Sequence, residues 1–202
     1  MSKETIRIAN CSGFYGDKLS IAKEMVEGGP IDVLTGDYLA ELTMTILYNQ
    51  KMKRGEEHGY VGTFIKQFRD VAKISQDKNI KIVTNAGGLN PKSMAQEIEK
   101  VVNELNLDLK VSYIDGDNLI PEMEKLTKLG EKFSNLDKNI DLKDYSKKAI
   151  TANAYLGAWG IKEALDNGAD VVVCPRVTDA AVVIGPAAWK FNWSRDQYDE
   201  LA

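Results

Sequence analysis

Six apolar runs in this chain are each followed by a short loop rich in Gly, Asn, Ser and Asp, and this rhythm strongly constrains the fold. The loops are residues 10–17, 35–37, 85–91, 115–117, 152–157 and 175–179. Most leading runs have the pattern of buried strands, and most trailing segments have the apolar spacing of helices. Strands that alternate with helices predict a parallel sheet, which places all such loops at one edge, where ligands bind.

The expected fold is therefore α/β, with a mostly parallel, open and doubly wound sheet that has helices on both faces. Five or six strands in 202 residues are too few for an eight-stranded barrel. The run Val171–Val173 lacks polar alternation, which favours a strand buried on both faces. Residues 1–202 are expected to form a single domain. Within it, the Lys-, Asp- and Asn-rich residues 124–150 predict a polar insertion or a lid over the loop edge.

Local signals predict how several helices begin and end. Asn90 followed by Pro91 is a favourable helix start, because Asn caps a free N–H and Pro fits the first turn. Asp17 is expected to cap the helix that runs to Gly28. The pair at 185–186, Gly then Pro, is expected to break the helix between residues 179 and 190. The chain ends inside a predicted helix, from which we expect it to be one part of a longer protein.

Composition narrows the class of protein. The net charge of −4 supplies no strong positive field, so nucleic acid is not an expected partner. No apolar run has the length of a membrane span, and the first residues lack the apolar core of a signal peptide. Only two cysteines occur, Cys11 and Cys174, and they are far apart in sequence. We interpret them as small buried hydrophobes in a reduced, cytoplasmic protein.

Acid–base chemistry is expected to depend on carboxylates, because His58 is the only histidine and lies between two predicted helices. Because His58 lies away from the predicted strand ends, a Ser/His/Asp triad is not expected unless another chain contributes. A two-His metal site would likewise need a histidine from another chain. The carboxylates that follow predicted strands, and form the candidate catalytic set, are Asp37, Asp115, Asp117 and Asp179. In one low-dielectric pocket, the pKa of one of them would be raised toward neutrality, so that it could act as a general acid. Two of them could also bind one Mg²⁺ or Mn²⁺ ion between them. The alternative for each is a helix N-cap.

Several polar residues at the same edge are candidates for substrate binding. The turn with Ser12 and Gly13 could cradle a phosphate through its N–H groups, or be only a tight turn. Gly87 and Gly88 could let the backbone approach a ligand. The Arg176 guanidinium could bind a carboxylate or phosphate of a ligand. The alternative is that it forms an internal ion pair with Asp179. Amide side chains expected to hold a charged group or donate to a carbonyl are those of Asn10, Asn85 and Asn153, with the Tyr155 ring at the same mouth.

Five stretches of the chain resemble the N-terminal region of the acyclic terpene utilisation (AtuA-like) family. They are residues 8–17, 29–41, 84–91, 152–157 and 176–180. The resemblance implies a role in catabolism of acyclic terpenoids or branched-chain acids, with an acyl-CoA-type substrate whose CoA is part of the bound molecule. It also implies a longer protein, of which this chain is the N-terminal half, and a small ferredoxin-like-fold partner.

The leading hypothesis from this reading is an enzyme domain with lyase or hydratase chemistry on a branched acyl-CoA. The alternative is a non-catalytic ligand-binding subunit that needs a partner chain or the C-terminal half for activity. A nucleotide-dependent oxidoreductase is disfavoured, because the chain has no dinucleotide-binding fingerprint. The sequence leaves open the metal, the substrate and whether the protein is a homo-oligomer.

Overall fold

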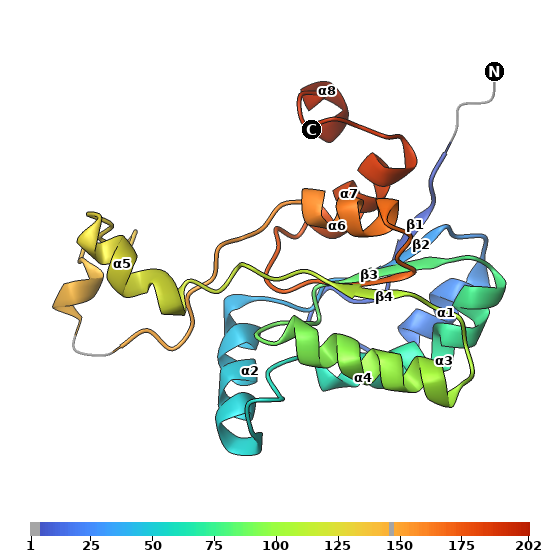
Figure 1. The fold of residues 1–202 in the computed structure, drawn as a ribbon, viewed down its shortest axis with the longest axis horizontal. Coiled ribbons are helices and arrows are strands. Elements are labelled where there is room, and N and C mark those ends of the chain that lie inside the picture. Colours follow the sequence, from blue (N-terminus) through green and yellow to red (C-terminus); the bar gives the residue numbers. More distant parts are fainter. Residues whose placement is uncertain (1–4, 146–147) are drawn as a thin grey trace.

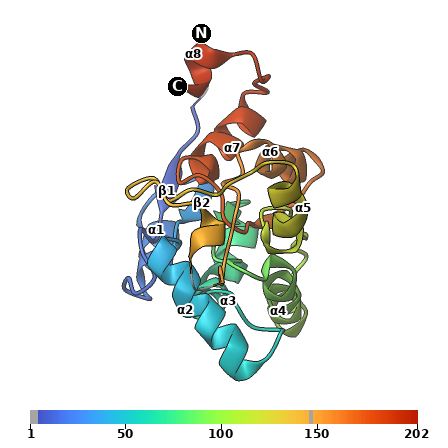
Figure 2. The same ribbon diagram turned by 90° about the vertical axis from the view of Figure 1, so that its left-hand side faces the viewer.

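The fold is an open sheet of five parallel strands with helices on both faces (Figures 1 and 2). It is described by a computed structural model that covers residues 5–145 and 148–202. The strand order is β1-β2-β3-β5-β4, and every neighbouring pair is parallel. The strands are β1 (Ile8–Asn10), β2 (Val33–Gly36), β3 (Lys81–Thr84), β4 (Val111–Tyr113) and β5 (Val171–Val173). The predicted α/β class and the helices on both faces are confirmed.

Alternate strand residues enter two separate cores. In β5, Val171 and Val173 pack into the core on one face, whereas Val172 packs into the core on the other. This two-sided burial explains why the run has no polar alternation. The first core is covered by α1 (Ile21–Gly28), α3 (Gly62–Asp77) and α4 (Pro91–Glu104), and the second by α6 (Trp159–Asp166) and α7 (Ala181–Lys190).

The strand order creates a switch point between β3 and β5. The chain moves across the sheet from β1 to β4 with its helices on one face, then returns to β5 with α6 on the other face. This arrangement keeps the hand of all crossovers the same. The loop after β3 leads to α4 on one face, and the loop after β5 leads to α7 on the opposite face. Such a divergence opens the crevice in which doubly wound proteins bind ligands.

Two segments extend beyond the edge where the strands end. Helix α2 (Glu41–Arg54) follows β2, and a long polar segment follows β4 and projects away from the sheet (Figure 1). That segment contains the short helices η1 (Ile120–Glu122), α5 (Met123–Lys128) and η2 (Leu142–Asp144). It includes most of the predicted insertion at 124–150, of which 146 and 147 lie outside the described residues. Its role as a lid stays a prediction.

The helix termini test the predictions made from local sequence signals. Asn90 caps α4 as predicted, because its side-chain oxygen accepts the Ser93 N–H at 3.1 Å and Pro91 occupies the first turn. The cap predicted at Asp17 is wrong, since α1 begins at Ile21 after Ser20. The predicted break at 185–186 is also wrong, because α7 continues through Pro186.

Packing explains why α7 tolerates a proline. At Gly185 an added Cβ would lie 2.6 Å from the Cβ of Ile161, so this glycine lets α7 approach α6 closely. The close contact compensates for the hydrogen bond that proline removes. The last helix, α8 (Tyr198–Leu201), is short. No helix in the described part of the chain is long and apolar enough to cross a membrane.

Candidate functional site

Asn85 joins the loops that follow β2 and β3. Its side chain is completely buried, its oxygen accepts the Tyr38 N–H at 2.7 Å, and its amide nitrogen donates to Asp37 at 2.5 Å. A buried amide that uses both ends in this way fixes its own orientation and that of its neighbours. Asn85 therefore positions the Asp37 carboxylate at the loop edge.

Arg176 is the buried cation of this edge. Its guanidinium donates to the Val177 carbonyl at 3.3 Å and to the Asp179 carboxylate at 3.1 Å. Its side chain is only 6% exposed, whereas that of Asp179 is 71% exposed. The ion pair that was the alternative to ligand binding is therefore present. It uses one guanidinium nitrogen, and the planar group has five N–H donors.

The face of the Arg176 guanidinium is covered by the Tyr155 ring. The guanidinium carbon lies 4.0 Å from the ring centre, within the range of a cation–π interaction. The Tyr155 hydroxyl in turn donates to the carboxylate of Glu41 in the first turn of α2. Residues from three distant parts of the chain therefore hold one another at the mouth of the site.

A hollow of about 280 Å³ lies beside this cluster. It runs between the start of α2 and residues 151–155, and Arg176 closes one side of it. Its lining residues are Glu41, Met44, Thr45, Thr151, Ala152, Asn153, Tyr155 and Arg176. The volume is just below the range for small-molecule sites, which starts at about 300 Å³. The hollow therefore suits a small acyl group or a short polar head, with the rest of a larger ligand outside.

Asp37 is one of two candidate aspartates whose pKa is raised, the other being Asp117. Burial is the largest influence and raises the pKa of the half-buried Asp37 carboxyl above its ordinary value. The Asn85 hydrogen bond and the Arg176 charge lower the pKa, and the Asp179 charge raises it. A carboxyl with a raised pKa exchanges protons more readily near neutral pH than an exposed one. Asp37 does not line the hollow. It is near enough to Arg176, which does line the hollow, for the Arg176 charge to act on its carboxyl.

Asp117 has a positioning role in the structure. It is buried, and one carboxylate oxygen accepts the Asn153 amide at 2.7 Å and the Arg176 backbone N–H at 3.2 Å. Burial raises the pKa of Asp117 as its largest influence, and these hydrogen bonds lower it. Asp117 therefore fastens the loop after β4 to Arg176 and to the segment with Asn153. Asp115, on the same loop, is exposed and does not line the hollow.

None of the four candidate aspartates caps a described helix. Helix α2 begins after Ala40 and α7 begins after Ala180, and neither start has a side-chain cap. Asp37 accepts the Leu39 N–H only at 3.4 Å. Helix capping, the alternative explanation of these residues, is therefore absent from the part of the chain that the structure describes.

The free N–H groups of the turn after β1 are hydrogen-bonded to a side chain of the same turn. The N–H groups of Gly13 and Phe14 donate to the Asp17 carboxylate at 2.8 and 3.2 Å, and the Ser12 hydroxyl donates to it at 3.3 Å. An internal carboxylate thus occupies the place predicted for a phosphate. Asn10 also bonds locally, because its amide donates to the Ser12 carbonyl at 2.8 Å. The Asp17 side chain organises this turn instead of the helix that follows.

The glycine pair after β3 packs against this chain itself. An added Cβ at Gly87 would lie 2.5 Å from the Cys174 carbonyl oxygen, and one at Gly88 would lie 2.4 Å from a methyl carbon of Leu47. Gly88 also has a φ of +54°, which favours glycine. Close packing against the loop after β5 accounts for Gly87, and close packing against α2 accounts for Gly88. Their role in ligand binding stays a prediction.

Two other sequence expectations concern histidine and metal. His58 lies in the loop between α2 and α3, where it was predicted. Among residues 5–145 and 148–202, no group of three or more His, Cys, Asp or Glu side chains could hold a metal ion. Sequence reasoning missed Glu41, although it follows Asp37 by four residues. The only signal was its place in a helix start beside the loop edge.

Comparison with known proteins identifies the family. A sequence model described as acyclic terpene utilisation family protein AtuA matches residues 6–202. No curated protein and no solved structure matches this chain. Because the match covers nearly the whole chain, the protein belongs to the acyclic terpene utilisation (AtuA) family, which suggests a role in the use of acyclic terpenes.

Proposed function

We propose that this chain carries the substrate site of an enzyme of acyclic terpenoid catabolism. The substrate is a branched acyl-CoA-type molecule, and the reaction is of the lyase or hydratase type. The observation that carries the proposal is the buried Arg176 at the wall of a hollow, with the half-buried Asp37 under the influence of its charge. The family suggests a role in the use of acyclic terpenes, and the acyl-CoA form of the substrate and the roles of the residues are part of the proposal.

Arg176 is the group that binds charge or a carbonyl oxygen in this proposal. Its guanidinium is already oriented by Tyr155 and Asp179, so little side-chain freedom is lost when a ligand binds. The Asn153 amide uses one N–H for Asp117 and has a second N–H for a substrate oxygen. Both groups would stabilise negative charge that develops on a thioester carbonyl.

Asp37 is the proton carrier in this proposal. In hydration, the oxygen of water bonds to one alkene carbon, and the protonated Asp37, which lies outside the hollow, passes its proton to the other carbon through a bridging water molecule. The surplus proton of the water passes to a second base, for which Asp179 is the candidate. Dehydration runs through the same steps in reverse. Such general acid–base catalysis contributes roughly 10²- to 10⁴-fold to a rate.

The first test is thermal unfolding of the chain with branched acyl-CoA, free CoA, NAD(P) and divalent ions as separate probes. A ligand that binds only the folded state raises the apparent melting temperature. We expect a rise with branched acyl-CoA, and a much smaller rise in an Arg176→Lys variant. Absence of any rise with acyl-CoA would contradict the proposed site.

Turnover separates the enzyme from its alternative. We expect Asp37→Asn to bind branched acyl-CoA like the parent chain and to lose at least about 100-fold in rate. Binding without turnover in the parent chain would favour the non-catalytic ligand-binding subunit. In that case a small ferredoxin-like partner or a C-terminal region would be added, and turnover in the mixture would support that alternative.

A further inference from the structure

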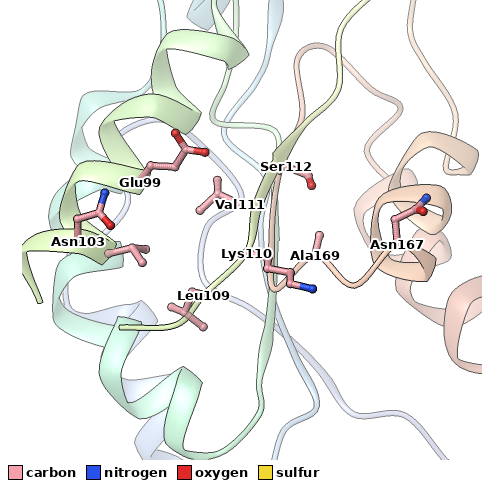
Figure 3. A pocket seen from close by; sticks show the side chains of 9 residues that line it. Glu99, Asn103, Leu109, Lys110, Val111, Ser112, Asn167 and Ala169 are labelled. Carbon is pink, nitrogen blue, oxygen red and sulfur yellow. The ribbon is translucent and has the colours of Figure 1, made fainter. Parts of the chain in front are cut away.

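A second surface feature lies at the open edge of the sheet, away from the candidate site. A groove of about 530 Å³ follows the first half of β4 and the residues before it (Figure 3). Glu99 and Asn103 of α4 form one side, and Asn167 at the end of α6 lies on the other. Between them runs the β4 backbone, with Lys110 and Ser112 labelled in the same view.

The main chain of β4 is used on one side only. β4 is at the end of the strand order, and within residues 5–145 and 148–202 it pairs with β5 alone. The Lys110 carbonyl accepts the Val171 N–H at 3.0 Å, and the Ile114 N–H donates to Val173 at 2.9 Å. Because a strand alternates the direction of its polar groups, the N–H and C=O groups of Val111 and Tyr113 face outward, away from β5. Of these two residues, Val111 lines the groove.

These outward groups are self-complementary. If a second copy of β4 lies antiparallel with Ser112 opposite Ser112, Val111 of each copy faces Tyr113 of the other. Both are then hydrogen-bonded pairs, and each exchanges two main-chain bonds. The same register places a β-branched residue opposite an aromatic one twice, a favourable cross-strand pair. It also covers the Tyr113 side chain, which is 41% exposed in the single chain.

We propose that this edge joins two copies of the chain through β4, to give one continuous sheet across a twofold axis. The groove carries one acidic and one basic side chain, Glu99 and Lys110. Two facing grooves therefore bring together two charges of each sign, so the charges of these side chains sum to zero. A twofold axis repeats every contact, which is the usual geometry of homodimers. The proposal is independent of the function proposed above.

A cysteine cross-link tests the register directly. In the proposed pairing the two Ser112 residues form a non-hydrogen-bonded pair with Cα atoms about 4.5 Å apart, within the range for a disulfide. We expect Ser112→Cys to form a covalent dimer under mild oxidation. The matched control is Lys110→Cys, whose two copies would be roughly 14 Å apart along the strands and should not cross-link. The native Cys11 and Cys174 are buried and do not interfere.

Mass measurement in solution tests the dimer itself. We expect the parent chain to be dimeric by sedimentation equilibrium, and Tyr113→Pro to be monomeric. Proline removes the Tyr113 ring and, among the main-chain donors of β4, only the outward N–H of residue 113, so the hydrogen bonds to β5 are kept, and circular dichroism will check the fold. Tyr113→Phe keeps the N–H and the ring, and should remain dimeric. A monomeric parent chain, a dimer that survives Tyr113→Pro, or a Ser112→Cys variant that does not cross-link would each overturn the proposal.

Discussion

The guanidinium of Arg176 stacks on the ring of Tyr155 at 4.0 Å, and the Tyr155 hydroxyl binds Glu41. This chain of contacts connects the loop after β5, the segment before α6 and the start of α2. It holds a buried positive charge in a fixed direction at the mouth of a small hollow. The candidate site depends on this relationship more than on any single residue.

Removal of the Tyr155 ring is expected to weaken the fold at the loop edge. Tyr155→Ala loses the cation–π contact with a buried guanidinium, and we expect the free energy of unfolding to fall by about 1–2 kcal/mol. Tyr155→Phe keeps the ring over Arg176 and loses only the bond to Glu41, so its loss should be smaller. Urea unfolding of the two variants measures the difference. Equal losses would show that the ring contact contributes little.

Asp37→Asn is expected to change how stability depends on pH. The pKa of Asp37 is raised in the folded chain above its ordinary 3.8, so its stabilising contribution is complete below that ordinary pKa. It is lost as the pH rises through the raised pKa. Asparagine stays neutral, so we expect the variant to become more stable relative to the parent chain as the pH rises toward neutrality. Melting temperatures over this pH range measure the effect.

The control for this comparison is Asp115→Asn, because Asp115 is exposed and the change removes the same charge. A gain in the Asp115→Asn variant equal to that in Asp37→Asn would assign the effect to net charge. A fall in the stability of Asp37→Asn relative to the parent chain as the pH rises toward neutrality would contradict the pKa direction given above.

Gly87→Ala is expected to destabilise the chain by about 1–3 kcal/mol, the usual effect of overpacking. The new Cβ would lie 2.5 Å from the Cys174 carbonyl oxygen and 2.8 Å from the Pro91 Cβ, and neither atom can move freely. Gly62→Ala is the matched control, because no atom lies within 4 Å of its added Cβ. Denaturant unfolding should find the control unchanged or slightly more stable. Equal stability of the two variants would contradict this packing.

Both cysteines are expected to be unreactive in the folded chain. Burial raises the pKa of Cys11 to about 11 and raises that of Cys174 as well, so neither is a thiolate at neutral pH. A colorimetric thiol reagent should therefore detect no free thiol in the native chain and two after unfolding. Fast reaction of one thiol before unfolding would show that its strand end opens to solvent.

The sequence by itself determined most of the helices and strands, and the edge of the sheet at which the loops after the strands gather. Hydrophobic periodicity and caps act over a few residues, which is why Val171–Val173 and the start at Asn90 were predicted well. The same short range explains two errors. The Asp17 carboxylate accepts N–H groups of the preceding turn instead of the following helix, and Pro186 was tolerated because α7 packs closely on α6.

Only the tertiary structure decided which loops meet. The insertion of β5 between β3 and β4 brings Arg176 between Asn85 and Asp117, and the arrangement of α2 brings Glu41 to Tyr155. Strand order and helix placement follow from crossover handedness and the burial of two cores, which involve residues far apart in the chain. No local pattern contains that information. The candidate aspartates were therefore predictable as a group, whereas their separate positions, with Asp115 exposed and Asp117 buried, were not.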